Sequence, residues 1–269
     1  MKEETASSWD NFGKILSQIR NQRQEYQGKS HTHVSGLLYR GQPNSCWGLD
    51  TSLDRSITQP VKLIEYFRLA RSAKFKLESF TDRSWAIPTQ NEYTEYLKSD
   101  KRPLIPFELY EYFIHLRHHG FPSPLLDWTA SPYVAAFFAM RNPAKDVEVV
   151  SVFAFMKYAG HGALSDADKP EIDELGPNVR AHRRHFLQQS AYTVCAVTAG
   201  EDSVYSKHEN AFANRFMIQD LLWKINIPVA ARKEFLAKLH EMNINSFSLF
   251  ANEDSLLETL ATDIFVLVR

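Results

Sequence analysis

The apolar residues in the first half of the chain recur mostly at helical spacing. Trp9, Phe12 and Ile19 fall on one face of a short amphipathic helix that follows polar capping residues. The same period predicts helical structure over residues 61–80 and again over residues 107–116. The front half of the chain is therefore predicted to be largely helical.

The second half has a different pattern, in which short runs rich in Val, Ile, Phe and Tyr predict strands. These runs are residues 147–155, 191–197, 216–218, 224–227, 246–250 and 264–268. Residues 160–178 are acidic and interrupted by glycines and prolines, which is typical of a solvated surface loop. Residues 233–242 return to helical spacing. Together the patterns predict an α+β fold, with a helical N-terminal half packed on a mixed, mainly antiparallel β core.

A polar stretch, residues 21–35, follows the first amphipathic helix and predicts a linker. We therefore divide the chain into an N-terminal helix and linker, residues 1–35, and one domain, residues 36–269. Simple packing of the first helix onto the domain is favoured over a partner-binding role. No internal repeat or low-complexity tract suggests a further division.

Composition narrows the classes of protein that need to be considered. The chain has 269 residues, is 44% hydrophobic and has a formal net charge of −1, so no overall field attracts it to nucleic acid or to an anionic membrane. Its two cysteines favour a reducing compartment, and hence the cytoplasm. No segment approaches the roughly 18 apolar residues of a membrane span, and the N-terminus is too polar for a signal peptide. We expect a cytoplasmic protein with no membrane contact.

Residues 116–140 carry the densest set of chemical groups. Gly120 stops a helix, because glycine readily takes the left-handed conformation that often follows a helix C-terminus. The prolines that follow exclude helix, and residues 127–129 are predicted to form a turn after a short extended segment. Ser131 and Pro132 then read as an N-cap and a first helical residue. A strand, a polar turn and a helix N-terminus in this order predict a pocket for a phosphate or a ribose hydroxyl.

Structural roles for the same residues stay open at this point. Asp127 and Thr129 would serve equally well as turn caps, and Trp128 as a core anchor whose indole N–H binds a carbonyl. The histidines at positions 115, 118 and 119 lack the carboxylate or cysteine that would complete a zinc site, so we expect no metal. A glycine-rich dinucleotide fingerprint, a phosphate loop and a Gly-x-Ser-x-Gly elbow are all missing from the sequence.

Two stretches taken together resemble the FRG domain, a family named for its (Phe/Tyr)-Arg-Gly motif. They are YRGQ at residues 39–42, followed by W-x-L-x-T-S-L-x-R at residues 47–55, and HHG-x-P-x-x-LLDWT-x-S-P-x-x-A-x-x-FA at residues 118–139. The resemblance extends through Arg184-x-x-x-Gln188-Gln189 and residues 243–250. The sequence departs from the family pattern at Arg117, at residues 123–124, at Ser190 and at residues 251–254, and the first two departures weaken any role of the glutamine and the arginine replaced there.

A second resemblance, to ADP-ribosyltransferases, implies a chemistry. These enzymes place an arginine on a strand, often within Tyr-Arg-Gly, ahead of a polar strand that leads into a small-residue helix and a later strand with Glu or Gln. By this resemblance Arg40 would bind a phosphate or the nicotinamide ribose of NAD, and Gly41 would allow the ligand close to the backbone. Asp127 or Thr129 would hold the ribose, Tyr39 or Trp128 would stack on nicotinamide, and Gln188 would orient the substrate.

The resemblance thus implies two overlapping sets of site residues. The catalytic set is Arg40, Asp127, Thr129 and Gln188. The set that binds NAD is Tyr39, Arg40, Gly41, Gln42, Arg55, His118, Trp128 and Arg184. The glutamate that such enzymes place near the ribose 2′-hydroxyl is not evident, and Glu209 is a carboxylate candidate for that role.

Three functions follow from these observations. The first is an enzyme, an NAD-dependent ADP-ribosyltransferase that modifies RNA or protein as a toxin or antiphage effector, with a candidate antitoxin or defence-system partner. The second is a non-catalytic nucleotide or nucleic-acid sensor, in which Arg40, Arg55, His118 and Arg184 form a basic pocket. The third is a hydrolase of NAD or of a nucleic-acid backbone. In a purely structural reading, Arg40 would instead be one member of a buried ion pair.

Overall fold

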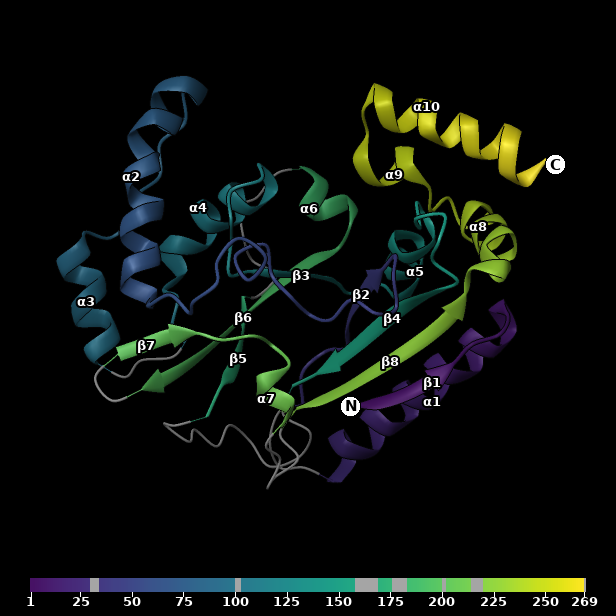
Figure 1. Cartoon of the computed structure of the whole chain (residues 1–269), viewed down its shortest axis with the longest axis horizontal. Coiled ribbons are helices and arrows are strands. Elements are labelled where there is room, and N and C mark those ends of the chain that lie inside the picture. Colours follow the sequence, from purple (N-terminus) through teal and green to yellow (C-terminus); the bar gives the residue numbers. More distant parts are fainter. Residues whose placement is uncertain are drawn as a thin grey trace.

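A mixed β-sheet forms the centre of the molecule (Figure 1). The computed structural model describes residues 1–29, 34–99, 103–157, 169–175, 183–199, 202–213 and 220–268. In these residues the sheet has eight strands in the order β1-β8-β4-β2-β3-β6-β5, with β7 paired to β6. The strands are β1 (Lys2–Thr5), β2 (Leu38–Gln42), β3 (Leu126–Thr129), β4 (Val149–Met156), β5 (Glu171–Leu175), β6 (Ser190–Ala199), β7 (Asp202–Tyr205) and β8 (Leu221–Pro228). The β1–β8 pair is parallel and the other pairs are antiparallel.

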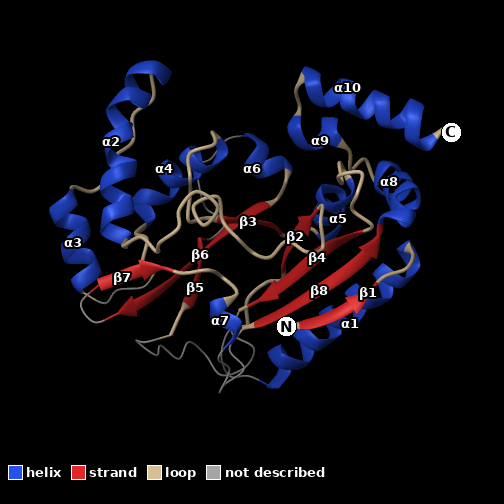
Figure 2. Ribbon diagram, in the orientation of Figure 1, coloured by secondary structure: helices blue, strands red, loops and turns tan. Residues whose placement is uncertain are grey.

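Helices gather at both ends of this sheet (Figure 2). They are α1 (Trp9–Lys29), α2 (Leu63–Thr81), α3 (Gln90–Lys98), α4 (Phe107–His118), α5 (Pro132–Met140), α6 (Arg183–Leu187), α7 (Asn210–Ala213), α8 (Arg232–Glu241), α9 (Ser246–Phe250) and α10 (Glu253–Thr262). The 3₁₀ turn η1 (Val229–Ala231) precedes α8, and the π-helical turn η2 (Asp263–Leu267) follows α10. Figure 2 shows α2, α3 and α4 together at the β7 end, with α8, α9 and α10 at the opposite end. Among the described residues, no helix combines the length and the apolar character that a membrane span requires.

The structure confirms the predicted α+β class and the main periodic elements. Helices were predicted over residues 61–80, 107–116 and 233–242, and these are α2, α4 and α8. The predicted strands over residues 147–155, 191–197 and 224–227 are β4, β6 and β8. The first helix packs on the body, as expected, because Phe12, Leu16 and Ile19 are buried in a cluster with α5 and α8.

Two predicted strands near the C-terminus are wrong. Residues 246–250 form α9, because the Asn245 side chain accepts from the Ser248 N–H while the Ser248 hydroxyl accepts from the Asn245 N–H. This reciprocal capping box nucleates a helix and outweighs the strand preference of a short Phe- and Leu-containing run. Residues 264–268 lie in and just after η2, which continues from α10 instead of pairing with the sheet.

Other boundaries also need correction. The predicted linker, residues 21–35, is largely helical because α1 continues to Lys29. The loop predicted over residues 160–178 contains β5, in which the buried Asp173 carboxylate accepts a hydrogen bond from the Leu104 N–H at 3.0 Å. The remaining parts of that loop, residues 160–168 and 176–178, and the strand predicted over residues 216–218 lie outside the described residues, and β1 and α3 were not predicted.

Helix α5 lies directly on strand β2 at Gly41. A Cβ atom at this position would lie 1.9 Å from the Ala135 carbonyl oxygen and 2.7 Å from the Ala139 nitrogen. Both atoms belong to the helix backbone, so a side chain at position 41 would push the helix away from the strand. The glycine of the YRGQ motif is therefore needed for packing between helix and sheet, and the close approach of a ligand to its backbone stays a prediction.

Replacing Gly41 by alanine tests this contact. We expect Gly41→Ala to lower the free energy of unfolding by about 2 to 3 kcal/mol or more, because the clash is with backbone atoms that cannot rotate away. The matched control is Gly13→Ala in α1, where an added Cβ meets nothing within 4 Å. That substitution is expected to be neutral or to stabilise by up to about 1 kcal/mol, as alanine is the better helix former. Urea denaturation followed by circular dichroism measures both, and equal effects would contradict the account.

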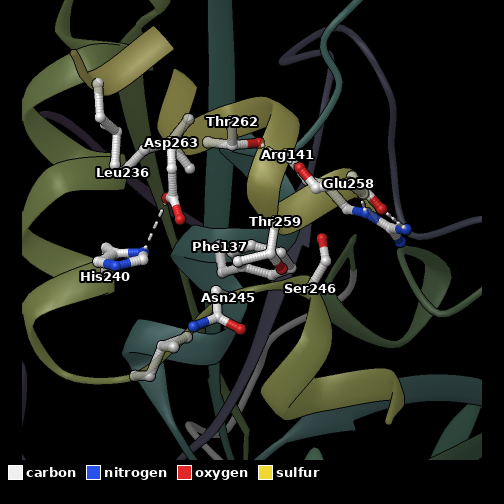
Figure 3. Close-up of a pocket in the computed structure, with 12 residues that line it drawn as sticks. Phe137, Arg141, Leu236, His240, Asn245, Ser246, Glu258, Thr259, Thr262 and Asp263 are labelled. Atoms are coloured by element: carbon white, nitrogen blue, oxygen red, sulfur yellow. Dashed lines mark hydrogen bonds and ion pairs between the residues drawn. The ribbon is translucent and has the colours of Figure 1, made fainter. Parts of the chain in front are cut away.

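An ion pair joins the C-terminal helices to α5. Figure 3 shows Arg141, just after α5, and Glu258 on α10 in direct contact among the residues that line a small pocket. The Arg141 Nε donates to Glu258 Oε1 at 2.6 Å, and its Nη2 donates to Oε2, so the contact is bidentate. Hydrogen bonding to Arg141 lowers the pKa of Glu258 below its usual value, although partial burial acts in the opposite direction.

The lowered pKa of Glu258 predicts a pH-dependent contribution to stability. The carboxylate favours the folded state above its unfolded pKa of about 4.3, and the contribution is lost as pH falls through the lower folded value. Glu258→Gln should therefore lower the free energy of unfolding by about 1 kcal/mol near pH 7 and by less in acid. Denaturant titrations between pH 3 and pH 7 measure the difference, with the exposed Glu253→Gln on α10 as control. A difference independent of pH would contradict this assignment.

Candidate functional site

A cavity opens where strands β2 and β3 separate. In the described residues the two strands pair at one register position, Tyr39 with Thr129, and a cavity of about 310 Å³ lies beyond it. Tyr39, Arg40, Gly41, Gln42, Pro43, His118, Asp127, Trp128, Thr129, Phe138, Gln188, Ser190 and Tyr192 line this cavity. We call it the central cavity.

The fold brings together most of the residues proposed from the sequence, although they come from distant segments. Tyr39, Arg40, Gly41, Gln42, His118, Asp127, Trp128, Thr129 and Gln188 all line the central cavity. Arg55 and Arg184 do not line it. The four residues proposed as catalytic therefore share one cavity, and their catalytic roles stay predictions.

Arg40 lies inside strand β2, which continues to Gln42 in register with β4. Its Nη1 donates to the Asp127 carbonyl oxygen at 2.8 Å. Its Nε is buried and has no hydrogen-bond partner among the described residues, and no carboxylate there forms an ion pair with it. Burial lowers the pKa of Arg40 to about 10, with Arg117 and Arg55 acting in the same direction and Asp127 against it. The guanidinium thus stays charged at neutral pH.

Asp127 lies on strand β3, which corrects the predicted turn over residues 127–129. Pairing of Asp127 with Tyr192 in the β3–β6 ladder keeps this segment extended. Its Oδ2 accepts from Arg117 Nη2, while its Oδ1 is buried without a partner among the described residues. The arginine that departs from the family pattern is therefore the ion-pair partner of Asp127, and Arg40 forms no ion pair among the described residues.

Tyr192 forms the polar centre of one cavity wall. Its hydroxyl lies 2.8 Å from His118 Nε2 and 3.1 Å from His185 Nδ1. The ring stacks with His185 at an interplanar angle of 15° and meets His118 edge-on at 86°. Burial raises the pKa of the Tyr192 hydroxyl, as does the charge of Asp127, so the phenol remains protonated and can donate a hydrogen bond.

Thr129 and Gln188 hold the cavity walls together. The Thr129 hydroxyl donates to the Gln188 carbonyl at 2.7 Å and accepts from the Ser131 N–H at 3.1 Å. The Gln188 side-chain amide donates to the Leu249 carbonyl at 3.2 Å, which connects the cavity to α9. Ser131 is the N-cap of α5, as predicted, and accepts from the Val134 N–H. These bonds give Thr129 and Gln188 a structural role in the ligand-free protein.

Trp128 is a core anchor, which was the structural alternative considered for it. The side chain is 3% exposed, and its indole Nε1 donates to Thr193 Oγ1 at 2.7 Å. Thr193 Oγ1 in turn lies 2.9 Å from the His208 Nε2. Burial, together with the nearby Arg40 charge, lowers the pKa of His208 to about 3, so this histidine is neutral at physiological pH. Because its side chain is buried, Trp128 offers little surface for stacking on nicotinamide.

Tyr39 and Gln42 are also committed to the scaffold. Tyr39 is 2% exposed and belongs to the core cluster that includes α1 and α5. The Gln42 side-chain amide donates to the Gly48 carbonyl at 2.8 Å, which holds the loop after β2. Both residues still border the central cavity, so a ligand would meet part of their surface.

Three residues proposed from the sequence lie elsewhere. Arg55 is exposed and donates to the Asp50 carbonyl at 2.8 Å, so it contributes charge near the cavity but no direct contact. Arg184, on α6, lies over the Phe250 ring at 5.4 Å. Glu209 accepts from the Leu49 N–H at 3.2 Å, which ties it to the loop after β2. The basic pocket predicted from Arg40, Arg55, His118 and Arg184 does not form as one cluster.

Several residues of the site were not identified from the sequence. Arg117 was treated as a departure that weakened the family pattern, and Tyr192 only as a marker of a strand. Phe138 and Ser190 also line the cavity. Tyr192 could have been found from its place two residues after Ser190, because alternate residues of a strand share a face. Among the described residues, no group of three or more His, Cys, Asp or Glu side chains is placed to hold a metal ion.

Residues 35–148 match the family model of the FRG domain. This segment contains both the YRGQ and the LLDWT motifs, and the match confirms the resemblance to the FRG domain that was inferred from them. The match ends before β4, so the extension of the domain to residue 269 stays a prediction. Comparison with curated proteins gave no match, and neither did comparison with solved structures.

Proposed function

We propose that the central cavity binds NAD and that the protein transfers ADP-ribose from it to a macromolecule, either RNA or protein. The observation that carries this proposal is that one cavity is lined by two groups of opposite charge, each with a polar atom that has no hydrogen-bond partner among the described residues. These are the Arg40 guanidinium, with its unpartnered Nε, and the Asp127 carboxylate, with its unpartnered Oδ1. A ligand with both an anionic group and a hydroxyl would satisfy the two.

The cavity's size and charge support a nucleotide ligand. Arg40 and Arg117 together exceed the single negative charge of Asp127, which favours a phosphate. About 310 Å³ is near the lower end of the range for small-molecule sites. This volume suits the nicotinamide–ribose half of NAD, with the adenosine half outside the cavity.

Asp127 is the carboxylate that we propose in place of the glutamate that was not evident in the sequence. When the bond between ribose C1′ and nicotinamide breaks, its electron pair moves to the nicotinamide ring and positive charge develops on the ribose. A carboxylate oxygen that accepts a hydrogen bond from a ribose hydroxyl stabilises this charge. We assign that role to Asp127 Oδ1, with Arg117 holding the carboxylate in place through Oδ2.

His118 is the group proposed to take the proton of the acceptor. A hydroxyl or amine of the acceptor would form the new bond to C1′ and lose its proton as the bond forms. His118 lines the cavity, and Tyr192 holds its imidazole through Nε2. Histidine is the side chain that most often transfers protons in enzymes. By the resemblance stated above, such a transferase would act as a toxin or antiphage effector.

A nucleotide sensor without catalysis is the second candidate. It is favoured by the bonds of the Thr129 and Gln188 side chains to main-chain carbonyls, which give two of the four residues proposed as catalytic a structural role. Hydrolysis of NAD, the third candidate, would use water as acceptor in the same cavity. It would release free ADP-ribose instead of labelling a macromolecule.

The direct test incubates the purified protein with NAD labelled in the adenylate moiety and with cell RNA or lysate. We expect label on a macromolecule. Asp127→Asn should lower the rate by about 100-fold or more, because the amide cannot stabilise the developing charge. Arg40→Lys should lower it by about tenfold or more, because an ammonium lacks the planar fork. The exposed Arg68→Lys and Asp146→Asn variants serve as matched controls and should retain the full rate.

The outcomes separate the three candidates. Free ADP-ribose without labelled macromolecule would identify a hydrolase. A rise in melting temperature on adding NAD, without turnover, would identify a sensor. No turnover and an unchanged melting temperature would contradict NAD as the ligand. Denaturant titration of Arg40→Lys checks that any loss of rate is not loss of folding.

A further inference from the structure

A second cavity lies on the other side of the Tyr39–Thr129 pair. It has a volume of about 430 Å³, and its walls include Arg20, Arg23 and Gln24 from α1 together with Ala130 and Pro132 before and at the start of α5. Tyr39 borders both this cavity and the central one. We call it the outer cavity.

The outer cavity is positively charged. Arg20, Arg23 and Gln24 are three and four residues apart, so their side chains project from the same face of α1. No carboxylate lines the cavity, and neither arginine has an acidic partner among the described residues. Two guanidinium groups around one space without a counter-charge favour an anionic ligand.

The positions of the two arginines are partly fixed. Arg23 Nε donates to the Ser35 carbonyl at 2.8 Å, and its terminal nitrogens have no hydrogen-bond partner among the described residues. Arg20 is exposed and lies near enough to the buried Tyr39 phenol to oppose the rise in the pKa of Tyr39 that burial causes. The start of α5 also lines the cavity, at Pro132, and adds the partial positive charge of a helix N-terminus.

We propose that the outer cavity is a phosphate-binding site, in which Arg20 and Arg23 grip the phosphate group of a nucleotide or of a single-stranded RNA. The planar guanidinium groups match phosphate oxygens with paired hydrogen bonds. The position next to the central cavity suits two phosphate sources, the dinucleotide itself or the backbone of an RNA that enters it. The site does not depend on any reaction in the central cavity.

The test measures binding of two probes in the absence of turnover. Labelled oligouridylate is followed by fluorescence anisotropy and NAD by calorimetry, both at low salt, for wild type and for Arg20→Glu. Lys14→Glu is the matched control, because Lys14 is exposed on the same helix, does not line the cavity and undergoes the same change of charge. We expect Arg20→Glu to weaken at least one probe by about tenfold or more, and Lys14→Glu to weaken it by less than about twofold.

The results decide both the site and its source of phosphate. If Arg20→Glu weakens the binding of NAD alone, the cavity binds the phosphate of the dinucleotide. If it weakens the binding of oligouridylate alone, the cavity binds the RNA backbone. Equal effects of Arg20→Glu and Lys14→Glu, or no binding of either probe by the wild type, would overturn the proposal. If both variants have the melting temperature of the wild type, misfolding is excluded as the cause of weaker binding. If Arg20→Glu loses oligouridylate binding while the wild type does not turn over NAD, the outer site stands and the transferase proposal falls.

Discussion

A partly buried arginine that forms no ion pair with a carboxylate among the described residues is the constraint on which the site depends. A charge removed from water costs several kcal/mol unless it is paired. Asp127 is near enough to compensate Arg40, but its Oδ2 is bound by Arg117, and Arg40 bonds to the Asp127 main chain instead. The ligand-free protein therefore holds a charged group whose most favourable partner is an anion from outside.

The fold keeps this arrangement in place by fixing both strands from their outer sides. Strand β2 is paired with β4 along its whole length and is pressed by α5 at Gly41. Strand β3 is paired with β6, and the bonds of Thr129 join it to the turn before β6. Because β2 and β3 meet only at Tyr39 and Thr129 in the described residues, the space beyond that pair stays open for a ligand.

The sequence predicted which residues line the central cavity better than it predicted the secondary structure around them. Arg40 and Asp127 were placed in one pocket because each lies in a recognisable motif, and both line the cavity. The extended conformation at Asp127 depends on its pairing with Tyr192 of β6, and local turn signals do not report a contact so distant in the sequence. The pairing of Arg117 with Asp127 is likewise a tertiary contact. The helix α9 could have been predicted from Asn245 and Ser248, since a capping box is a local signal.

The central claim is that the cavity between β2 and β3 receives the anionic part of a nucleotide at Arg40. A crystal structure of the protein soaked with ADP-ribose tests it most directly. The account predicts density for the ligand in the central cavity, with a phosphate or ribose oxygen within hydrogen-bond distance of the Arg40 guanidinium and a ribose hydroxyl at Asp127 Oδ1. An empty central cavity at saturating ADP-ribose, or a ligand bound without contact to Arg40, would contradict it.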